Sequence, residues 1–207
     1  MKHFITIILI VCCLFASSAQ KMENYFIQMP NDLIVLLEEA WRKDLVDIYK
    51  SGKPAVLENT MQGKSVLNKL TDHYLLVQTT ECSTVELKLL SLVNNTQIIC
   101  MIETFYAPVA DSRVSFYSTE WERIASDNVF TPVSKDWFWK TDIDSSLLEY
   151  LPQSDLFLVK YNLSDENATL TAEYKSPLLL DDETQQLVKP FLKTEPRLYE
   201  WKAGRFE

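Results

Sequence analysis

From Pro54 onward, the dominant spacing of apolar residues is two, and turn-forming residues separate the apolar runs. A period of two is typical of β-strands, because successive side chains point to opposite faces of a sheet. The alternation is clearest where Leu170, Ala172 and Tyr174 share one face. The runs predict strands at Ala55–Thr60, Tyr74–Thr80, Thr84–Val93, Gln97–Tyr106, Arg113–Thr119, Leu156–Leu163, Thr169–Lys175 and Arg197–Lys202, with hairpin turns at 62–64, 94–95 and 164–167.

One run, Ile98 to Ile102, is apolar at consecutive positions. A strand of this kind has no polar face to present to water, so both of its faces must be covered. We therefore predict a central strand with the N-terminal helix on one side and a second layer or loops on the other.

Two segments have helical character instead. Apolar residues between Asp32 and Lys50 follow the three- and four-residue spacing of an amphipathic helix, with Ser51-Gly52 as its end. A shorter helix is expected from Asp182 to Val188, capped by Asp181 or Asp182. The predicted class is α+β: a long N-terminal helix packed on a largely antiparallel meander sheet, with a short C-terminal helix and a final strand. Only three glycines occur and no linker is evident, so residues 20–207 are expected to form a single domain.

Residues 1–19 have the pattern of a secretory signal peptide: a basic start, an apolar run from Phe4 to Phe15, and small residues ending at Ala19. The run is shorter than the ~20 residues of a membrane-spanning helix. Lipid attachment at Cys12 or Cys13 is an alternative, although bulky residues precede both. We expect an exported protein of the periplasm or cell surface, with no membrane span after cleavage.

The charge balance narrows the choice of partner. The chain carries 20 Lys and Arg against 29 Asp and Glu, a net charge of −9. Binding to nucleic acid or to anionic membrane surfaces requires clustered positive charge, so both are disfavoured. The expected partner is an envelope protein or a glycan.

Two cysteines, Cys82 and Cys100, follow the leader. With Asn94-Asn95 as a two-residue turn, Cys100 would face Leu89, seven positions along the strand from Cys82. That separation is roughly 23 Å at ~3.3 Å per residue, too far for a disulfide. Two buried free thiols are the first expectation, and a different loop or strand order would reverse it.

The residues for common chemistries are sparse. His73 is the single histidine after the leader, and no zinc, nucleophile-elbow or phosphate-loop motif is present. Glu103, with Asp111 or Glu120, is a candidate glycosidase pair. Asp142 opens a calcium-like loop that lacks the required Gly and Glu. We expect no cofactor, no metal site and no catalytic residues, and the balance of evidence favours a non-enzyme.

Candidate binding residues lie elsewhere. Trp137 and Trp139 would share a face if their segment were a strand, and exposed rings mark interaction sites. The alternative is that these rings close the core. Asp111 would cap backbone amides, and Arg113 would pair with an acid. Alternatively, Arg113 would clamp a carboxylate or phosphate.

Six segments, spread over nearly the whole chain after the leader, carry a family resemblance: Phe26–Pro30, Arg42–Leu45, Ser83–Leu90, Ala107–Tyr117, Phe130–Val133 and Pro190–Leu192. Together they resemble a secreted family of unknown function from Bacteroidales bacteria. The resemblance implies export, and it implies no established activity, substrate or cofactor.

Three functions stay open at this point. The first is a non-enzymatic binding module of the cell envelope, which predicts exposed rings on an open sheet. The second is a carbohydrate-binding or glycoside-active protein, which as a glycosidase predicts two acids in a cleft. The third is a carrier of a small apolar ligand, which predicts a dry cavity inside a closed sheet.

Overall fold

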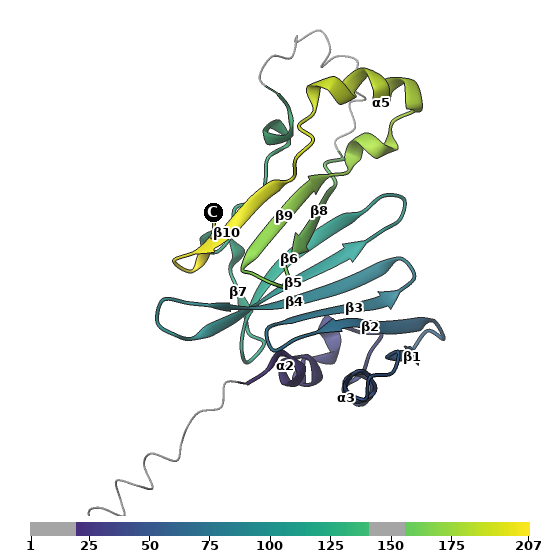
Figure 1. Cartoon of the computed structure of the whole chain (residues 1–207), viewed down its shortest axis with the longest axis vertical. Helices are drawn as coiled ribbons and strands as arrows, with labels where there is room; N and C mark the ends of the chain where they lie inside the picture. Colours follow the sequence, from purple (N-terminus) through teal and green to yellow (C-terminus); the bar gives the residue numbers. More distant parts are fainter. Residues whose placement is uncertain (1–19, 141–155) are drawn as a thin grey trace, which may run out of the picture.

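The structure, a computed structural model, describes residues 20–140 and 156–207. Two antiparallel sheets dominate it (Figure 1). Seven strands form the larger sheet in sequence order: β1 (Val56–Glu58), β2 (Lys64–Leu70), β3 (Tyr74–Thr80), β4 (Ser83–Ser91), β5 (Gln97–Phe105), β6 (Asp111–Ser118) and β7 (Arg123–Ile124). Four form the smaller sheet in the order β11-β10-β9-β8: β8 (Val159–Leu163), β9 (Thr169–Tyr174), β10 (Arg197–Lys202) and β11 (Arg205–Phe206).

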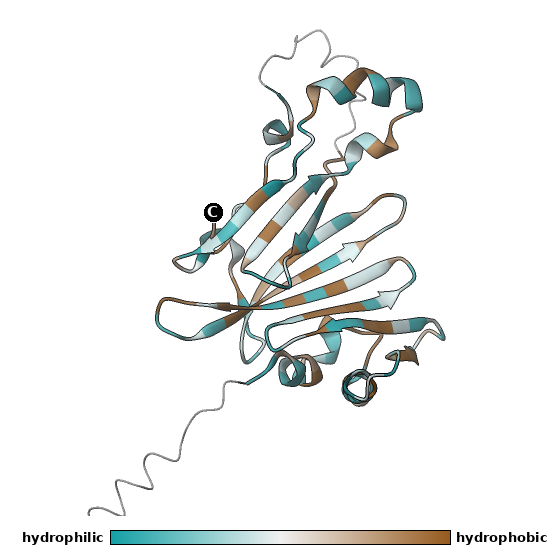
Figure 2. Ribbon diagram, viewed as in Figure 1, coloured by the Kyte–Doolittle hydropathy of each residue, from teal (hydrophilic) through white to brown (hydrophobic). Residues whose placement is uncertain are grey.

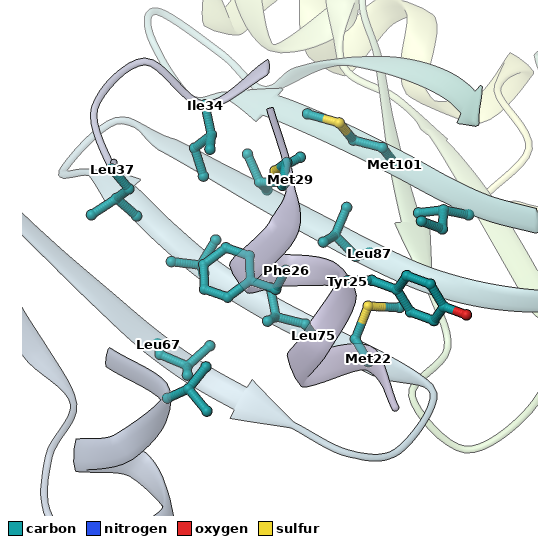
Figure 3. Packing of buried hydrophobic residues seen from close by; sticks show 14 of the residues in the cluster. Met22, Tyr25, Phe26, Met29, Ile34, Leu37, Leu67, Leu75, Leu87 and Met101 are labelled. Atoms are coloured by element: carbon teal, nitrogen blue, oxygen red, sulfur yellow. The ribbon is translucent and has the colours of Figure 1, made fainter. Parts of the chain in front are cut away.

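Each face of the larger sheet has its own apolar core. On one face, α2 (Met22–Gln28) and α3 (Glu39–Lys50) pack against the strands and form a helix-side core. Figure 3 shows Phe26 from α2 in this core together with Leu75 and Leu87 from the strands. On the other face, the smaller sheet forms a sheet-side core that includes Phe116 and Leu170. The larger sheet is therefore the middle layer of three.

The prediction of a central strand buried on both faces is confirmed at β5. This strand pairs with β4 on one side and with β6 on the other. Ile99 and Met101 belong to the helix-side core, whereas Ile98, Cys100 and Ile102 belong to the sheet-side core. Figure 2 shows hydrophobic residues along the central strands of the larger sheet.

The expected fold class, however, is wrong. The described chain is mostly β, and its three α-helices, α2, α3 and α5 (Asp182–Val188), are short. In residues 20–140, α2 and α3 lie on the sheet in place of the expected long N-terminal helix. Among the described residues, no helix combines the length and the apolar character needed to cross a bilayer. The expectation of one domain over residues 20–207 stays a prediction.

The predicted helix from Asp32 to Lys50 is interrupted between η1 (Asn31–Leu33) and α3, and buried Arg42 binds the chain that precedes α3. Its guanidinium donates to the carbonyl oxygens of Phe26 at 2.8 Å and Leu37 at 2.5 Å, and also to those of Ile27 and Met29. A continuous helix would use its carbonyls within its own backbone. Instead α3 begins only at Glu39, and α2, which the apolar spacing did not reveal, comes before it.

Several local predictions hold. The bounds of β3, β10 and α5 are those expected, and the Asp181 side chain caps α5 by accepting from the Thr184 amide at 2.9 Å. The hairpins after β1, β4 and β8 are present. Strand β2 was missed, and so were the two-residue strands β7 and β11.

Buried Asn59 holds the turn that leads into β2. Its side-chain oxygen accepts from the amides of Met61 at 3.0 Å and Gly63 at 3.1 Å, and its amide group donates to the Thr79 carbonyl at 3.0 Å. A β-carbon at Gly63 would lie 3.3 Å from the Asn59 amide nitrogen, which favours glycine there. Strand β2 itself, with the sequence KSVLNKL, has no regular alternation of apolar and polar residues, and so it escaped prediction.

Both described cysteines are free, as expected, but only Cys100 is buried; Cys82 is exposed. Cys100 pairs with Lys88 and not with Leu89. The register differs by one because the hairpin loop spans three residues: the Leu92 amide bonds to the Thr96 carbonyl, and Asn95 has a φ of 63°. The exposed position of Cys82 follows from its place at the β3–β4 turn.

Candidate functional site

Asp111 and Ser112 cover an exposed edge of the smaller sheet. Strand β8 pairs only with β9, so every second amide of β8 points away from its partner. The Asp111 carboxylate accepts from the Val159 amide at 3.0 Å, and the Ser112 hydroxyl accepts from the Tyr161 amide at 3.0 Å. Asp111 therefore joins the two sheets.

Glu86 completes this edge from β4. Its carboxylate accepts from the Leu163 amide at 2.9 Å and from the Tyr74 hydroxyl at 3.1 Å. Burial raises the pKa of Glu86, although both hydrogen bonds oppose that shift. Lys88, on the same face of β4, donates to the Ser164 carbonyl at 2.9 Å, and burial lowers its pKa. These buried charges have structural partners between the sheets.

Arg113 and Glu103 pair directly across β6 and β5. The Nε and Nη2 atoms of Arg113 donate to one Glu103 oxygen at 2.9 and 2.7 Å, and this bond raises the pKa of Arg113. The contacts are those expected for the structural roles of Asp111 and Arg113. The acids of the candidate glycosidase pair have other partners: Glu103 accepts from Arg113, Asp111 from the Val159 amide, and Glu120 from the Thr119 hydroxyl.

The remaining sequence candidates are His73 and the calcium-like loop. His73 is exposed at the entrance of β3, where its amide bonds to the Thr71 hydroxyl at 3.3 Å. Within residues 20–140 and 156–207, no group of three or more His, Cys, Asp or Glu side chains is arranged to hold a metal ion. The calcium-like loop from Asp142 lies outside the described residues.

Trp137 and Trp139 lie in and after a short 3-10 helix, η3 (Lys135–Phe138), and not in a strand. They consequently line different hollows. Phe138, between them, is buried and stacks on Tyr174 with the ring centres 5.2 Å apart. The shared face considered for the two tryptophans depended on a strand, and the segment forms a 3-10 helix instead.

Trp139 lines a hollow of about 330 Å³, which we call the Trp139 pocket. Most of its walls are apolar, and Lys135, Ser176 and Asp181 are its polar members; the others are Trp139, Leu156, Tyr174, Pro177, Leu179, Leu180 and Val188.

Trp137 lines a second hollow of about 440 Å³, open to solvent, which we call the Trp137 pocket. Its members are more polar: Thr131, Pro132, Val133, Ser134, Trp137, Arg197, Tyr199, Arg205, Phe206 and Glu207. The Arg197 guanidinium carbon lies 5.5 Å from the Trp137 ring centre and 5.2 Å from that of Tyr199. The Lys193 ammonium lies 4.3 Å from the Trp137 ring centre. Trp137 thus contacts two cations.

Buried Phe130 fixes the pocket walls. Its ring meets those of Tyr199 at 5.2 Å and Tyr161 at 5.5 Å, both edge-on, a favoured arrangement of aromatic pairs. The Tyr199 hydroxyl donates to the Thr131 carbonyl at 3.2 Å, and the Phe206 amide donates to the Val129 carbonyl at 2.8 Å. These contacts therefore hold segment 129–139 against β10 and β11, which pair with each other.

Sequence reasoning missed Arg197, Tyr199 and Arg205 as pocket residues. They lie about 60 residues after Trp137 in the chain, and no local spacing connects the two segments. The one available signal was the alternation of β10, which places Arg197 and Tyr199 on one face.

Comparisons with known proteins place the chain among uncharacterised ones. No curated protein matches it. A solved structure, a domain of an uncharacterised protein from Porphyromonas gingivalis W83, is similar over 91% of this chain and 99% of that chain, with a TM-score of 0.79 and 26% identity. Residues 14–206 match the model of a family described as "Protein of unknown function (DUF3256)". The chain therefore belongs to the DUF3256 family of proteins of unknown function.

Proposed function

We propose that this protein is a non-enzymatic binding module of the cell envelope, exported by residues 1–19 and working as one domain over residues 20–207. Its binding site is the Trp137 pocket. The observation that carries this proposal is that two segments far apart in the chain are held rigidly together around an open hollow that presents aromatic rings and cations.

Rigid support is what distinguishes a binding site from a surface depression. Side chains held in place before binding lose little conformational freedom when a ligand arrives, which favours affinity. Here the Phe130 ring cluster and the Tyr199–Thr131 hydrogen bond supply that support. Of the two tryptophans expected to bind, Trp137 contributes to this site.

The test is binding that depends on the pocket. Tagged protein is incubated with detergent-solubilised envelope of its host and, in parallel, with a glycan array. Arg197→Gln together with Arg205→Gln should abolish capture, whereas Arg123→Gln, which removes the same kind of charge from exposed β7, should not. Capture that survives the double variant would refute the assignment of this pocket.

A second candidate function is carriage of a small apolar ligand, favoured by the apolar walls of the Trp139 pocket. The route expected from the sequence, a cavity inside a closed sheet, does not support it, because both sheets of the described chain are open, ending at β1 and β7 or at β11 and β8. Enhanced fluorescence of an apolar dye, lost in Trp139→Ala and kept in Trp137→Ala, would support this candidate. Equal loss in both variants would reject it.

A further inference from the structure

The Trp137 pocket presents two arginines on a protein that is strongly negative. The whole chain has a net charge of −9, yet Arg197 and Arg205 line this hollow together with the acidic Glu207, and Lys193 lies beside it on the Trp137 ring. Solvent-exposed charges act over about 8–10 Å at physiological salt, so the acids on the rest of the surface are largely screened from a ligand in the pocket. The local charge is what such a ligand meets.

The way in which these cations are held leaves their charge available. Within the described residues, no ion pair joins Lys193 or Arg197 to an acid; rings contact them instead. A ring attracts a cation through its quadrupole and carries no net charge, so it orders the side chain without neutralising it. Arg205 differs, because the Glu207 carboxylate lies 3.6 Å from its Nε.

The pocket also restricts how a ligand is recognised. An extended peptide commonly binds by adding a strand to a free sheet edge. Strand β10 offers none, because β9 and β11 occupy its two sides. At β11, the end of the sheet, Phe206 already forms a bridge with Phe130. The groups that the pocket offers to a ligand are therefore mainly side chains, among them the guanidinium groups and the hydroxyl-bearing Thr131 and Ser134.

We infer that the Trp137 pocket binds an acidic saccharide through its carboxylate, which Arg197 receives. This inference rests on the proposed binding function and specifies the ligand. The planar guanidinium matches a carboxylate with two parallel hydrogen bonds, and hydroxyl side chains suit the hydroxyl groups of a sugar. Glu207 opposes binding, because it competes for Arg205 and repels the ligand.

The experiment is calorimetric titration of the purified protein with four probes: a linear tri-uronate, the matching neutral trisaccharide, triglutamate and inorganic phosphate. Only the tri-uronate should bind, and its affinity should fall as salt is raised. Arg197→Gln should weaken binding roughly tenfold or more, the scale of a lost charge-assisted hydrogen bond. Arg123→Gln should leave binding unchanged, and Glu207→Gln, which does not remove a pocket cation, should strengthen it.

The outcomes distinguish a wrong ligand class from a wrong proposed function. Equal binding of the neutral trisaccharide, or binding of triglutamate or phosphate in place of the tri-uronate, would overturn the acidic-saccharide inference and leave the binding function standing. Weaker binding in Glu207→Gln would overturn it as well, independently of any effect of Arg197→Gln on folding. If no probe binds but envelope capture still depends on Arg197, the ligand class is wrong. If capture fails too, the proposed function is wrong.

Discussion

Replacing Arg42 with methionine should destabilise the protein by about 3 kcal/mol or more. The guanidinium is fully buried and donates to four backbone carbonyls, those of Phe26, Ile27, Met29 and Leu37. The Phe26 carbonyl also accepts from the Met29 amide, so the variant leaves three carbonyls without the partner they have now. A buried polar group left without a partner costs about 1–3 kcal/mol, so three such groups at the lower limit give about 3 kcal/mol. Such a loss is a large fraction of the stability of a typical domain, ~5–15 kcal/mol.

The position of Arg42 also explains why lysine should not rescue it. Two of the carbonyls belong to the last turn of α2, where the helix dipole is negative, so a cation is favoured there. The Arg42 side chain additionally donates to the Asn31 side chain at 2.9 Å. An ammonium has three donors at one point and cannot span these acceptors, whereas the guanidinium has five in a planar fork. Arg42→Lys should therefore lose an intermediate amount.

Urea unfolding followed by tryptophan fluorescence and far-ultraviolet circular dichroism measures these losses, with an unchanged m value as the check that only stability has altered. Lys43→Met, at the exposed neighbouring position, is the control and should change little. A loss below about 1 kcal/mol for Arg42→Met would refute the reasoning, since the carbonyls would then have found other partners.

Three further predictions concern the interface between the sheets. Burial raises the pKa of Glu86, so the folded state holds the proton of this carboxyl group more tightly than the unfolded state does. The free energy of unfolding, compared with that of Glu86→Gln, should therefore fall as pH rises above the ordinary glutamate range. A difference that does not depend on pH would contradict this. Phe130→Ala should cost about 3–5 kcal/mol in chemical unfolding, as large-to-small core changes do, against little for exposed Phe105→Ala; similar losses would argue against the ring cluster. Asp111→Ala, but not Asp111→Asn, should speed hydrogen exchange at the Val159 amide. Exchange that stays slow in Asp111→Ala would show that another group covers the edge.

Predictions from the sequence succeeded where one local pattern had one structural solution. The consecutive apolar residues of β5 leave no face for water, so burial on both sides was the consistent outcome. The cap at Asp181 likewise involves a hydrogen bond to a residue three positions away. The prediction for the N-terminal segment failed because the apolar spacing fits a long helix, whereas the Arg42 side chain bonds to carbonyls up to 16 residues away.

In the candidate site, too, local features were predictable and contacts between distant residues were not. The sequence singled out Trp137 as an aromatic residue in an irregular segment, and the structure places it in an open pocket. Arg197 and Tyr199 could not be joined to it in advance, because the contact depends on packing of segment 129–139 against β10. Asp111 was recognised as a turn residue, but its partner, the Val159 amide, lies 48 positions later.

The sequence by itself determined most of the strands, the central position of β5, the short α5 helix and the scarcity of catalytic side chains, because these depend on residue type and on spacing within one element. Tertiary structure alone decided the split into two sheets, the interruption of the N-terminal helix, the covering of the β8 edge and the cation-lined Trp137 pocket. Each of these rests on contacts between residues distant in the chain, whose free energy outweighs local preference and leaves no periodic trace in the sequence.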